Sequence, residues 1–191
     1  MSDSTISADE IGRTLLNIAR TTLEEELGGS ASSWQEASWL RQPGACFVTL
    51  RRGRELRGCI GSIQADRPLV EDLQANARGA AFRDPRFPPV ESAELLDLTI
   101  EVSLLSPLER LEFDSEADLL KQLRPGHDGV LLEHGYHRGT FLPAVWRELR
   151  EPQVFLRRLK IKAGLAEDFW SPEIAVRRYT TQSWSEADLE R

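Results

Sequence analysis

Apolar residues recur at helical spacing in the first part of the chain. Ser7 stands three residues before Glu10, a capping-box pattern that opens a helix, and Gly28 stops the pattern. Four apolar residues between these signals fall on one side of a helix: Ile11, Leu15, Ala19 and Leu23. The pattern predicts a helix that packs this stripe on a sheet, followed by a surface loop over residues 28–38.

The pattern then changes to the alternation that is typical of strands. Residues 45–50 predict a strand, residues 51–55 a turn, and residues 56–63 the antiparallel partner. Apolar positions at helical spacing predict a second helix over residues 69–81, with Asp66 as its cap and Pro68 in its first turn. It must end before Asp84, because residues 83–89 contain three prolines and predict a stiff loop.

The second half of the chain mixes short elements of both kinds. It predicts a strand over 98–105, a helix from a cap at Asp114 to Leu123, a hairpin of 130–133 with 136–141, and helices over 143–149 and 152–163. The strands arrive mostly as hairpins, without a regular βαβ repeat. We therefore expect an α+β fold with a mainly antiparallel sheet flanked by helices. Residues 7–181 are expected to form a single domain, with residues 1–6 and 182–191 as loosely held tails.

Composition narrows the classes of function. The 191 residues carry a formal net charge of −7, and 40% are hydrophobic, which suits one globular domain with room for two lobes. An acidic total argues against nonspecific nucleic-acid binding, which needs clustered cations. The chain has no apolar run of the roughly 18 residues that a membrane helix needs, and its polar, acidic start does not resemble a signal peptide. We expect a cytoplasmic protein.

The chain has only two cysteines and no CxxC pattern, so its fold is not built on disulfides or on a cysteine-rich metal site. Phosphate-binding and hydrolase motifs such as Walker A, GxGxxG and GxSxG are also absent from the sequence. The sequence therefore predicts no cofactor and no metal.

The most unusual local sequence is Leu-Arg-Gly-Cys-Ile-Gly at residues 56–61, called the LRGCIG segment below. Glycine weakens a strand unless something approaches the backbone or a bulge is needed, so Gly58 and Gly61 are expected where the backbone is bent or closely approached. On one interpretation they give a ligand access to backbone N–H groups and to Cys59, with Arg57 favouring the thiolate. On the other, Cys59 is a small buried side chain and the glycines mark a bulge, and most buried cysteines are of this inert kind.

Two further groups could carry chemistry. The prolines around Asp84 and Arg86 hold these side chains in fixed directions, as a binding site requires, although a charged loop anchored by phenylalanines has the same pattern. His127 follows Pro-Gly at the entrance of a predicted strand and is a candidate for proton transfer, because its ordinary pKa lies near 6.5. His134 and His137 span a turn, which argues against a shared metal site.

Taken together, six segments resemble the AMMECR domain family, in particular the bacterial type called AmmeMemoRadiSam system protein A. They are LRGCIGSI at 56–63, AAFRDPRFPP at 80–89, LTIEVSLLSP at 98–107, RPGHDGVLLE at 124–133, GTFLPAVW at 139–146 and FLRRLKIKAGL at 155–165. The LRGCIG segment is the most specific of these. Where many relatives have His-Gly, this chain has His127, Asp128 and Gly129.

The resemblance implies a compact α+β domain with two unequal lobes and a cleft near the LRGCIG segment. It also implies association, by gene neighbourhood, with a Memo-type protein and a radical SAM protein. It implies no particular reaction. Matching positions carry over Arg57, Gly58, Cys59 and Gly61, and with them Asp84 and Arg86 of the proline-rich loop.

These observations predict an enzyme or enzyme component that binds a small anionic substrate. Cys59 is the expected nucleophile or covalent carrier, His127 the proton-transfer candidate, and Arg57 or Arg86 the anion-binding group, since an arginine fork fits carboxylates and phosphates. The alternative is a noncatalytic protein-binding or adaptor domain whose ligand is a peptide or partner loop. A third class, an RNA-linked protein, rests only on four arginines near one turn: Arg51, Arg52, Arg54 and Arg57.

Overall fold

The computed structural model describes residues 6–29 and 34–189, and the chain folds as two compact units. The first unit comprises Met1–Leu105 and Gln182–Arg191, and the second comprises Ser106–Thr181. The chain therefore leaves the first unit after β3, forms the second, and returns to complete the first.

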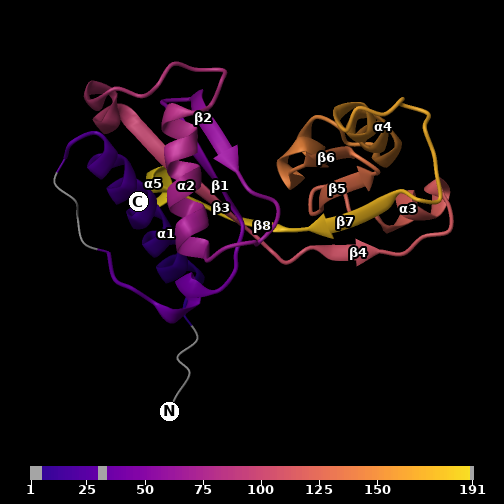
Figure 1. Ribbon diagram of the computed structural model, residues 1–191, viewed down its shortest axis with the longest axis horizontal. Coiled ribbons are helices and arrows are strands. Elements are labelled where there is room, and N and C mark those ends of the chain that lie inside the picture. Colours follow the sequence, from indigo (N-terminus) through magenta and orange to yellow (C-terminus); the bar gives the residue numbers. More distant parts are fainter. Residues whose placement is uncertain (1–5, 30–33, 190–191) are drawn as a thin grey trace, which may run out of the picture. The chain divides into compact units, whose positions relative to one another are not determined.

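The first unit is a four-stranded sheet with its two long helices on one face (Figure 1). The strand order is β2-β1-β3-β8, so β2 is an edge strand. Its elements are α1 (Ala8–Glu26), η1 (Ser38–Arg41), β1 (Cys46–Arg52), β2 (Glu55–Gly61), α2 (Leu69–Phe82), η2 (Ser92–Asp97), β3 (Leu98–Leu105), β8 (Thr181–Ser185) and α5 (Glu186–Leu189), where η marks a 3-10 helix.

Alternation along the strands builds the core of this unit. Val48 and Leu50 of β1 lie beside Val102 and Ile100 of β3, and all four are fully buried together with the apolar side of α1 and α2. The intervening side chains, such as Thr49, lie on the opposite face and are only partly buried. The sheet thus has one face under helices and one face that is more open.

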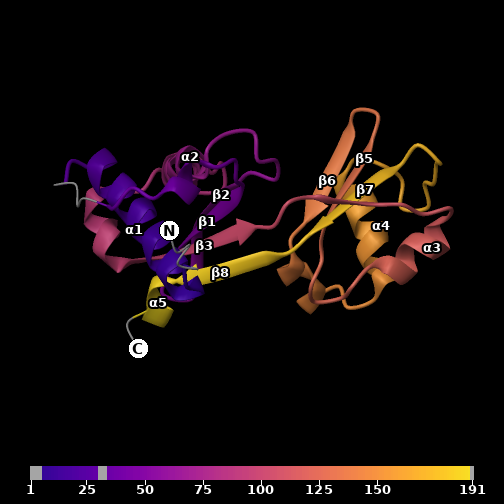
Figure 2. The same cartoon turned by 90° about the horizontal axis from the view of Figure 1, so that it is seen from below.

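The second unit holds another four-stranded antiparallel sheet, in the order β4-β7-β5-β6, with α3 and α4 beside it (Figure 2). Its elements are β4 (Glu109–Leu111), α3 (Glu116–Gln122), β5 (Gly129–His134), β6 (His137–Phe141), η3 (Pro143–Arg147), α4 (Pro152–Lys162) and β7 (Ala175–Tyr179). The rings of Trp146 and Phe155 stack 3.8 Å apart in its core, with an interplanar angle of 4°. This core is separate from that of the first unit.

The expected α+β class with antiparallel strands and flanking helices is confirmed. The predicted cap at Ser7 is also present, since its hydroxyl accepts a hydrogen bond of 3.2 Å from the Glu10 N–H. Two other caps were wrongly assigned. Ser115, rather than Asp114, caps α3, and α2 begins directly after Pro68 without a side-chain cap.

The prediction of a loose tail from residue 182 is wrong over the described residues. Residues 182–185 belong to β8, which lies beside β3. The Glu186 carboxylate accepts hydrogen bonds from the Ile100 N–H at 2.7 Å and from the Arg20 guanidinium. These contacts between distant segments order a polar sequence that has no strand pattern of its own. Among the described helices, none is long and apolar enough to cross a membrane.

Candidate functional site

The LRGCIG segment forms most of edge strand β2, and its register decides which way each side chain faces. Gly58 lies opposite the buried Leu50, so it faces the helices. Cys59 lies opposite Thr49, which in turn lies opposite Glu101 of β3. Because residues directly opposite each other share a face of the sheet, Cys59 belongs to the more open face.

Cys59 is partly buried, and its N–H and its sulfur each make a hydrogen bond to a side chain. Its backbone N–H donates to the Asp84 carboxylate at 2.9 Å, and its Sγ accepts from the Thr49 hydroxyl at 3.3 Å. The second contact places a hydroxyl donor on the sulfur. The structure therefore does not bury this cysteine as the inert interpretation expected.

The proline-rich loop covers the outer edge of β2. An edge strand presents unpaired N–H and C=O groups, and at Cys59 both are satisfied by side chains of this loop. Asp84 accepts from the N–H, and Arg86 donates to the C=O at 3.4 Å. The loop thus replaces a neighbouring strand at this residue, and it brings Asp84 and Arg86 next to Cys59.

Asp84 is only 4% exposed and accepts four hydrogen bonds. Three come from Arg86, through its backbone N–H and a two-pronged guanidinium contact at 2.9 and 2.7 Å, and the fourth comes from Cys59. The Arg86 side chain holds the pKa of Asp84 well below its usual range. Arg86 itself remains 54% exposed, and its guanidinium lies 5.5 Å from the centre of the Phe87 ring.

Arg57 occupies a bulge in β2 and contacts the end of the proline-rich loop and Glu94 of η2. The register shifts between Leu50 and Arg51, which leaves Arg57 as the extra residue. Its guanidinium makes a bidentate pair with Glu94 at 3.0 and 2.9 Å and donates to the carbonyls of Pro88 and Pro89. The arginine lowers the pKa of Glu94 to about 2. Four donations to the protein itself occupy most of the five N–H groups of Arg57.

Gly58 and Gly61 both lie where another group approaches closely. A Cβ on Gly58 would lie 2.0 Å from the Ala80 carbonyl oxygen of α2, and one on Gly61 would lie 2.2 Å from the Phe47 ring. The neighbours are parts of the protein's own core and sheet. The expectation of close approach is therefore met by packing within the first unit.

Cys46, the other cysteine, lies in a buried polar cluster around Asp72 at the start of α2. Asp72 accepts hydrogen bonds from the Cys46 N–H at 3.0 Å, from Arg67 and from Ser62, and Asn76 joins the same cluster. Burial, assisted by the Asp72 charge, raises the pKa of the Cys46 thiol far above its ordinary value. Cys46 is therefore a structural residue.

His127 lies on an exposed turn of the second unit, whereas the other predicted site residues belong to the first. Its neighbour Asp128 is fully buried and accepts three hydrogen bonds from Arg124, from the backbone N–H and from the side chain. Asp128 thus fastens the turn that carries His127. Within residues 6–29 and 34–189, no three His, Cys, Asp or Glu side chains are grouped as a metal site would require.

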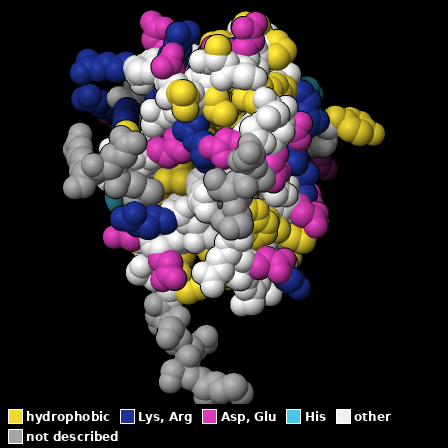
Figure 3. Space-filling view, turned by 90° about the vertical axis from the view of Figure 1, so that its left-hand side faces the viewer, with side chains coloured by type: hydrophobic (Ala, Val, Ile, Leu, Met, Phe, Trp, Pro, Cys, Tyr) yellow, Lys and Arg dark blue, Asp and Glu magenta, His cyan; other side chains and the backbone are white. Residues whose placement is uncertain are grey.

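Three of the four arginines on the β1–β2 hairpin lie near carboxylates. Arg51 is 3.7 Å from Glu101, Arg52 is 3.5 Å from Asp97, and Arg57 binds Glu94. On the face seen in Figure 3, cationic and anionic side chains are interspersed wherever the structure describes them. This arrangement gives little support to an RNA-binding hairpin.

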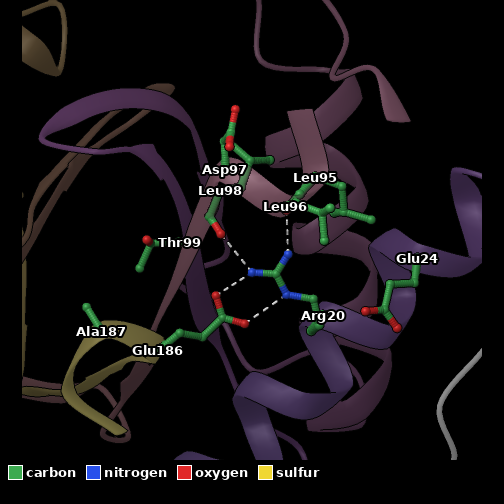
Figure 4. A pocket seen from close by; sticks show the side chains of 9 residues that line it. All are labelled: Arg20, Glu24, Leu95, Leu96, Asp97, Leu98, Thr99, Glu186 and Ala187. Atoms are coloured by element: carbon green, nitrogen blue, oxygen red, sulfur yellow. Dashed lines mark hydrogen bonds and ion pairs between the residues drawn. The ribbon is translucent and has the colours of Figure 1, made fainter. Parts of the chain in front are cut away.

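A pocket of about 620 Å³ lies elsewhere in the first unit, between α1, η2 and α5 (Figure 4). Its base is Arg20, whose guanidinium donates to both oxygens of Glu186 and to the carbonyls of Leu95 and Leu98. These contacts fix the end of the chain to α1 and leave Arg20 little capacity for a ligand. None of the predicted site residues lines this pocket.

Sequence reasoning missed Thr49 and Glu94, which contact predicted site residues. Thr49 could have been found, because strand pairing through the tight turn places it opposite Cys59. Glu94 lies 37 residues from Arg57 on a 3-10 helix, and no local pattern connects the two.

The comparisons with known proteins agree with one another. The sequence model of the AMMECR1 family matches residues 16–184. A protein of Methanothermobacter thermautotrophicus is 43% identical, covering 95% of this chain and 96% of its own length, and Methanocaldococcus jannaschii protein MJ0810 is 35% identical, covering 94% and 92%. The crystal structure of the uncharacterized protein PH0010 from Pyrococcus horikoshii superposes with a TM-score of 0.82 at 35% identity, covering 93% of this chain and 92% of that one.

Proposed function

This chain belongs to the AMMECR1 family, and from that premise we propose that it is an enzyme or enzyme component that binds a small anionic substrate beside the LRGCIG segment. Cys59 is the nucleophile or covalent carrier in this proposal. The proposed substrate lies against the open face of the first unit's sheet at Cys59.

One observation carries the proposal: a partly buried cysteine, with a hydroxyl donor on its sulfur, lies beside a half-exposed arginine. Arg86 donates to the Cys59 carbonyl and is oriented by the buried Asp84, which holds its guanidinium beside this residue. A half-exposed guanidinium beside a cysteine can bind an anionic group of a substrate next to the sulfur. Cys46 is buried, so a substrate cannot reach it in this way.

The other predicted residues receive narrower roles. Arg86 is the anion-binding group, since its side chain is 54% exposed, whereas that of Arg57 is 12% exposed and is engaged by Glu94 and the loop carbonyls. Gly58, Gly61 and Asp84 position β2 and Arg86. His127 remains a proposed proton-transfer residue, and its contribution is tested by whether His127→Gln lowers turnover once a substrate is known.

Cysteine reactivity tests the proposal directly. Native protein is treated with iodoacetamide at pH 7, and the rate at Cys59 is compared with that of a free model thiol, which is only about 3% thiolate at this pH. We expect Cys59 to react faster, and Cys59→Ser to abolish cellular function while the protein stays folded. Labelling no faster than the model thiol, together with full function of Cys59→Ser, would show that the covalent role is wrong.

A noncatalytic adaptor is the second candidate, and a specific observation favours it. The space beside Gly58 and Gly61 is taken by Ala80 and Phe47, so the glycines serve packing. In an adaptor, Cys59→Ser keeps partner binding and function.

The narrower placement in the AmmeMemoRadiSam system protein A type is also a proposal, as are a cytoplasmic location and association with Memo-type and radical SAM proteins. Six sequence segments that resemble this type support it. Co-expression of the three proteins, followed by purification through this chain, tests the association. Recovery of neither partner above the level of an unrelated control protein counts against it.

A further inference from the structure

Helix α4 of the second unit leaves a helical face without a partner in the described structure. Its buried side carries Phe155, Leu156 and Leu159 into the core. The opposite side carries four residues at the i, i+3, i+4 and i+7 spacing that places side chains on one face: Val154, Arg157, Arg158 and Ile161. Val154 is 42% and Ile161 47% exposed, which makes them two of the few large aliphatic side chains on the described surface. We call these four residues the α4 face.

The charge of this helix is entirely positive. Its 11 residues contain two arginines, two lysines and no acid. Lys160 is buried and paired with Glu116, and Lys162 lies over the Phe141 ring. For Arg157 and Arg158, no described carboxylate lies within 4.0 Å, although most arginines of the chain have such a partner.

The excess of positive charge on α4 differs from the net charge of the second unit and of the whole chain. Residues 106–181 contain 12 acidic and 12 basic residues, so the second unit is formally neutral, while the whole chain carries −7. Other arginines of the unit, such as Arg177 and Arg178, form ion pairs within it. Arg157 and Arg158, which have no carboxylate partner among the described residues, lie between two exposed aliphatic side chains, and overall composition does not explain this local arrangement.

From this arrangement we propose that the α4 face docks an acidic amphipathic helix of another protein. Aliphatic side chains at both ends of the face provide apolar contact, and the two arginines between them pair with carboxylates of the partner. Nucleic acid fits less well, because phosphate contacts need no aliphatic groups and base stacking needs aromatic ones. The proposal is independent of Cys59 chemistry.

Binding of a defined peptide tests the proposal. The probe is a fluorescent 16-residue helix-forming peptide with Leu along one side and flanking Glu, measured by fluorescence anisotropy with the full chain. We expect binding that weakens about tenfold in each of two double variants, Val154→Ser with Ile161→Ser and Arg157→Glu with Arg158→Glu. Lys121→Glu, which changes an exposed cation on α3 of the same unit, is the matched control and leaves the affinity unchanged.

Three probes of other chemistry accompany this peptide. They are a scrambled peptide of the same composition, a single-stranded RNA oligonucleotide, and vesicles containing phosphatidylserine. The proposal requires that the ordered peptide binds at least about tenfold more tightly than the scrambled one. Equal binding of the two peptides, preference for RNA or vesicles, no binding, or indifference to the aliphatic substitutions would each overturn it. Unchanged melting temperatures of the variants confirm that the fold is intact.

Discussion

Replacing Gly58 by alanine is the sharpest test of how the LRGCIG segment is built. The added Cβ would lie 2.0 Å from the Ala80 carbonyl oxygen and 3.0 Å from the Ala80 carbonyl carbon. Both atoms are helix backbone, so no side-chain rotation relieves the clash. Restoring an ordinary separation of about 3.4 Å requires β2 and α2 to move apart by about 1.4 Å, in a tightly packed region of the core.

Overpacking of this kind costs on the order of 1–3 kcal/mol of unfolding free energy. At about 2–4 °C per kcal/mol for a chain of this size, Gly58→Ala is expected to lower the melting temperature by about 2–12 °C. Valine, with two more methyl groups, costs more. The measurement is thermal unfolding followed by circular dichroism, with urea unfolding at 25 °C as a second estimate.

Two matched variants make the result interpretable. Glu55→Ala changes an exposed residue of the same strand and is expected to stay within about 0.5 kcal/mol of the wild type. The Cβ added by Gly61→Ala clashes with the Phe47 side chain rather than with backbone. Truncating Phe47 therefore restores the stability of Gly61→Ala but not that of Gly58→Ala. A Gly58→Ala protein as stable as the Glu55→Ala control would refute this account of the segment.

Three further outcomes follow from the charges and thiols of the first unit. Asp84→Asn is expected to lose about 1.5–3 kcal/mol at pH 7, because it removes charged hydrogen bonds to Arg86. Since folding lowers the pKa of Asp84 below its unfolded value of about 3.9, this contribution is present at neutral pH and lost in acid. Melting temperatures of the two proteins therefore converge as pH falls below about 4, and a constant gap contradicts the reasoning. Glu94→Gln behaves likewise, with a gap that closes between about pH 4.3 and the folded pKa of about 2, as acid unfolding curves would show. Iodoacetamide adds one group to the native protein, at Cys59, and a second at Cys46 only after unfolding; mass spectrometry of tryptic peptides checks this, and native labelling of Cys46 contradicts its burial.

Local patterns were sufficient for most elements of this fold. The stripe of α1, the hairpin of β1 and β2, and the hairpin of β5 and β6 each combine a clear period with a turn or cap signal. The strands β4, β7 and β8 lack such a combination of period and signal. β7 contains two adjacent arginines, and β8 is a short polar strand fixed through Glu186. These strands form because they contact distant segments of the chain, and a single sequence does not show such contacts.

The sequence indicated which residues form the candidate site better than it indicated how they contact one another. Glycines around a cysteine, and prolines around Asp84 and Arg86, indicated rigid and closely approached backbone. Local sequence could not show that Asp84 and Arg86 satisfy the edge of β2 at Cys59, because the two segments are 25 residues apart. Nor could it show that Glu94 forms a bidentate ion pair with Arg57. This pairing leaves Arg86 as the better candidate of the two predicted anion-binding arginines.

If Cys59 and Arg86 together form a site for anions, Cys59 reacts preferentially with an anionic reagent over a neutral one. Iodoacetate is anionic and iodoacetamide is neutral, so the ratio of their rates reports the local charge while cancelling general accessibility. We expect a higher ratio at Cys59 than at a free model thiol, a ratio retained in Arg86→Lys, and a return to the free-thiol value in Arg86→Gln. A wild-type ratio at or below that of the free thiol would show that Arg86 does not draw anions to Cys59.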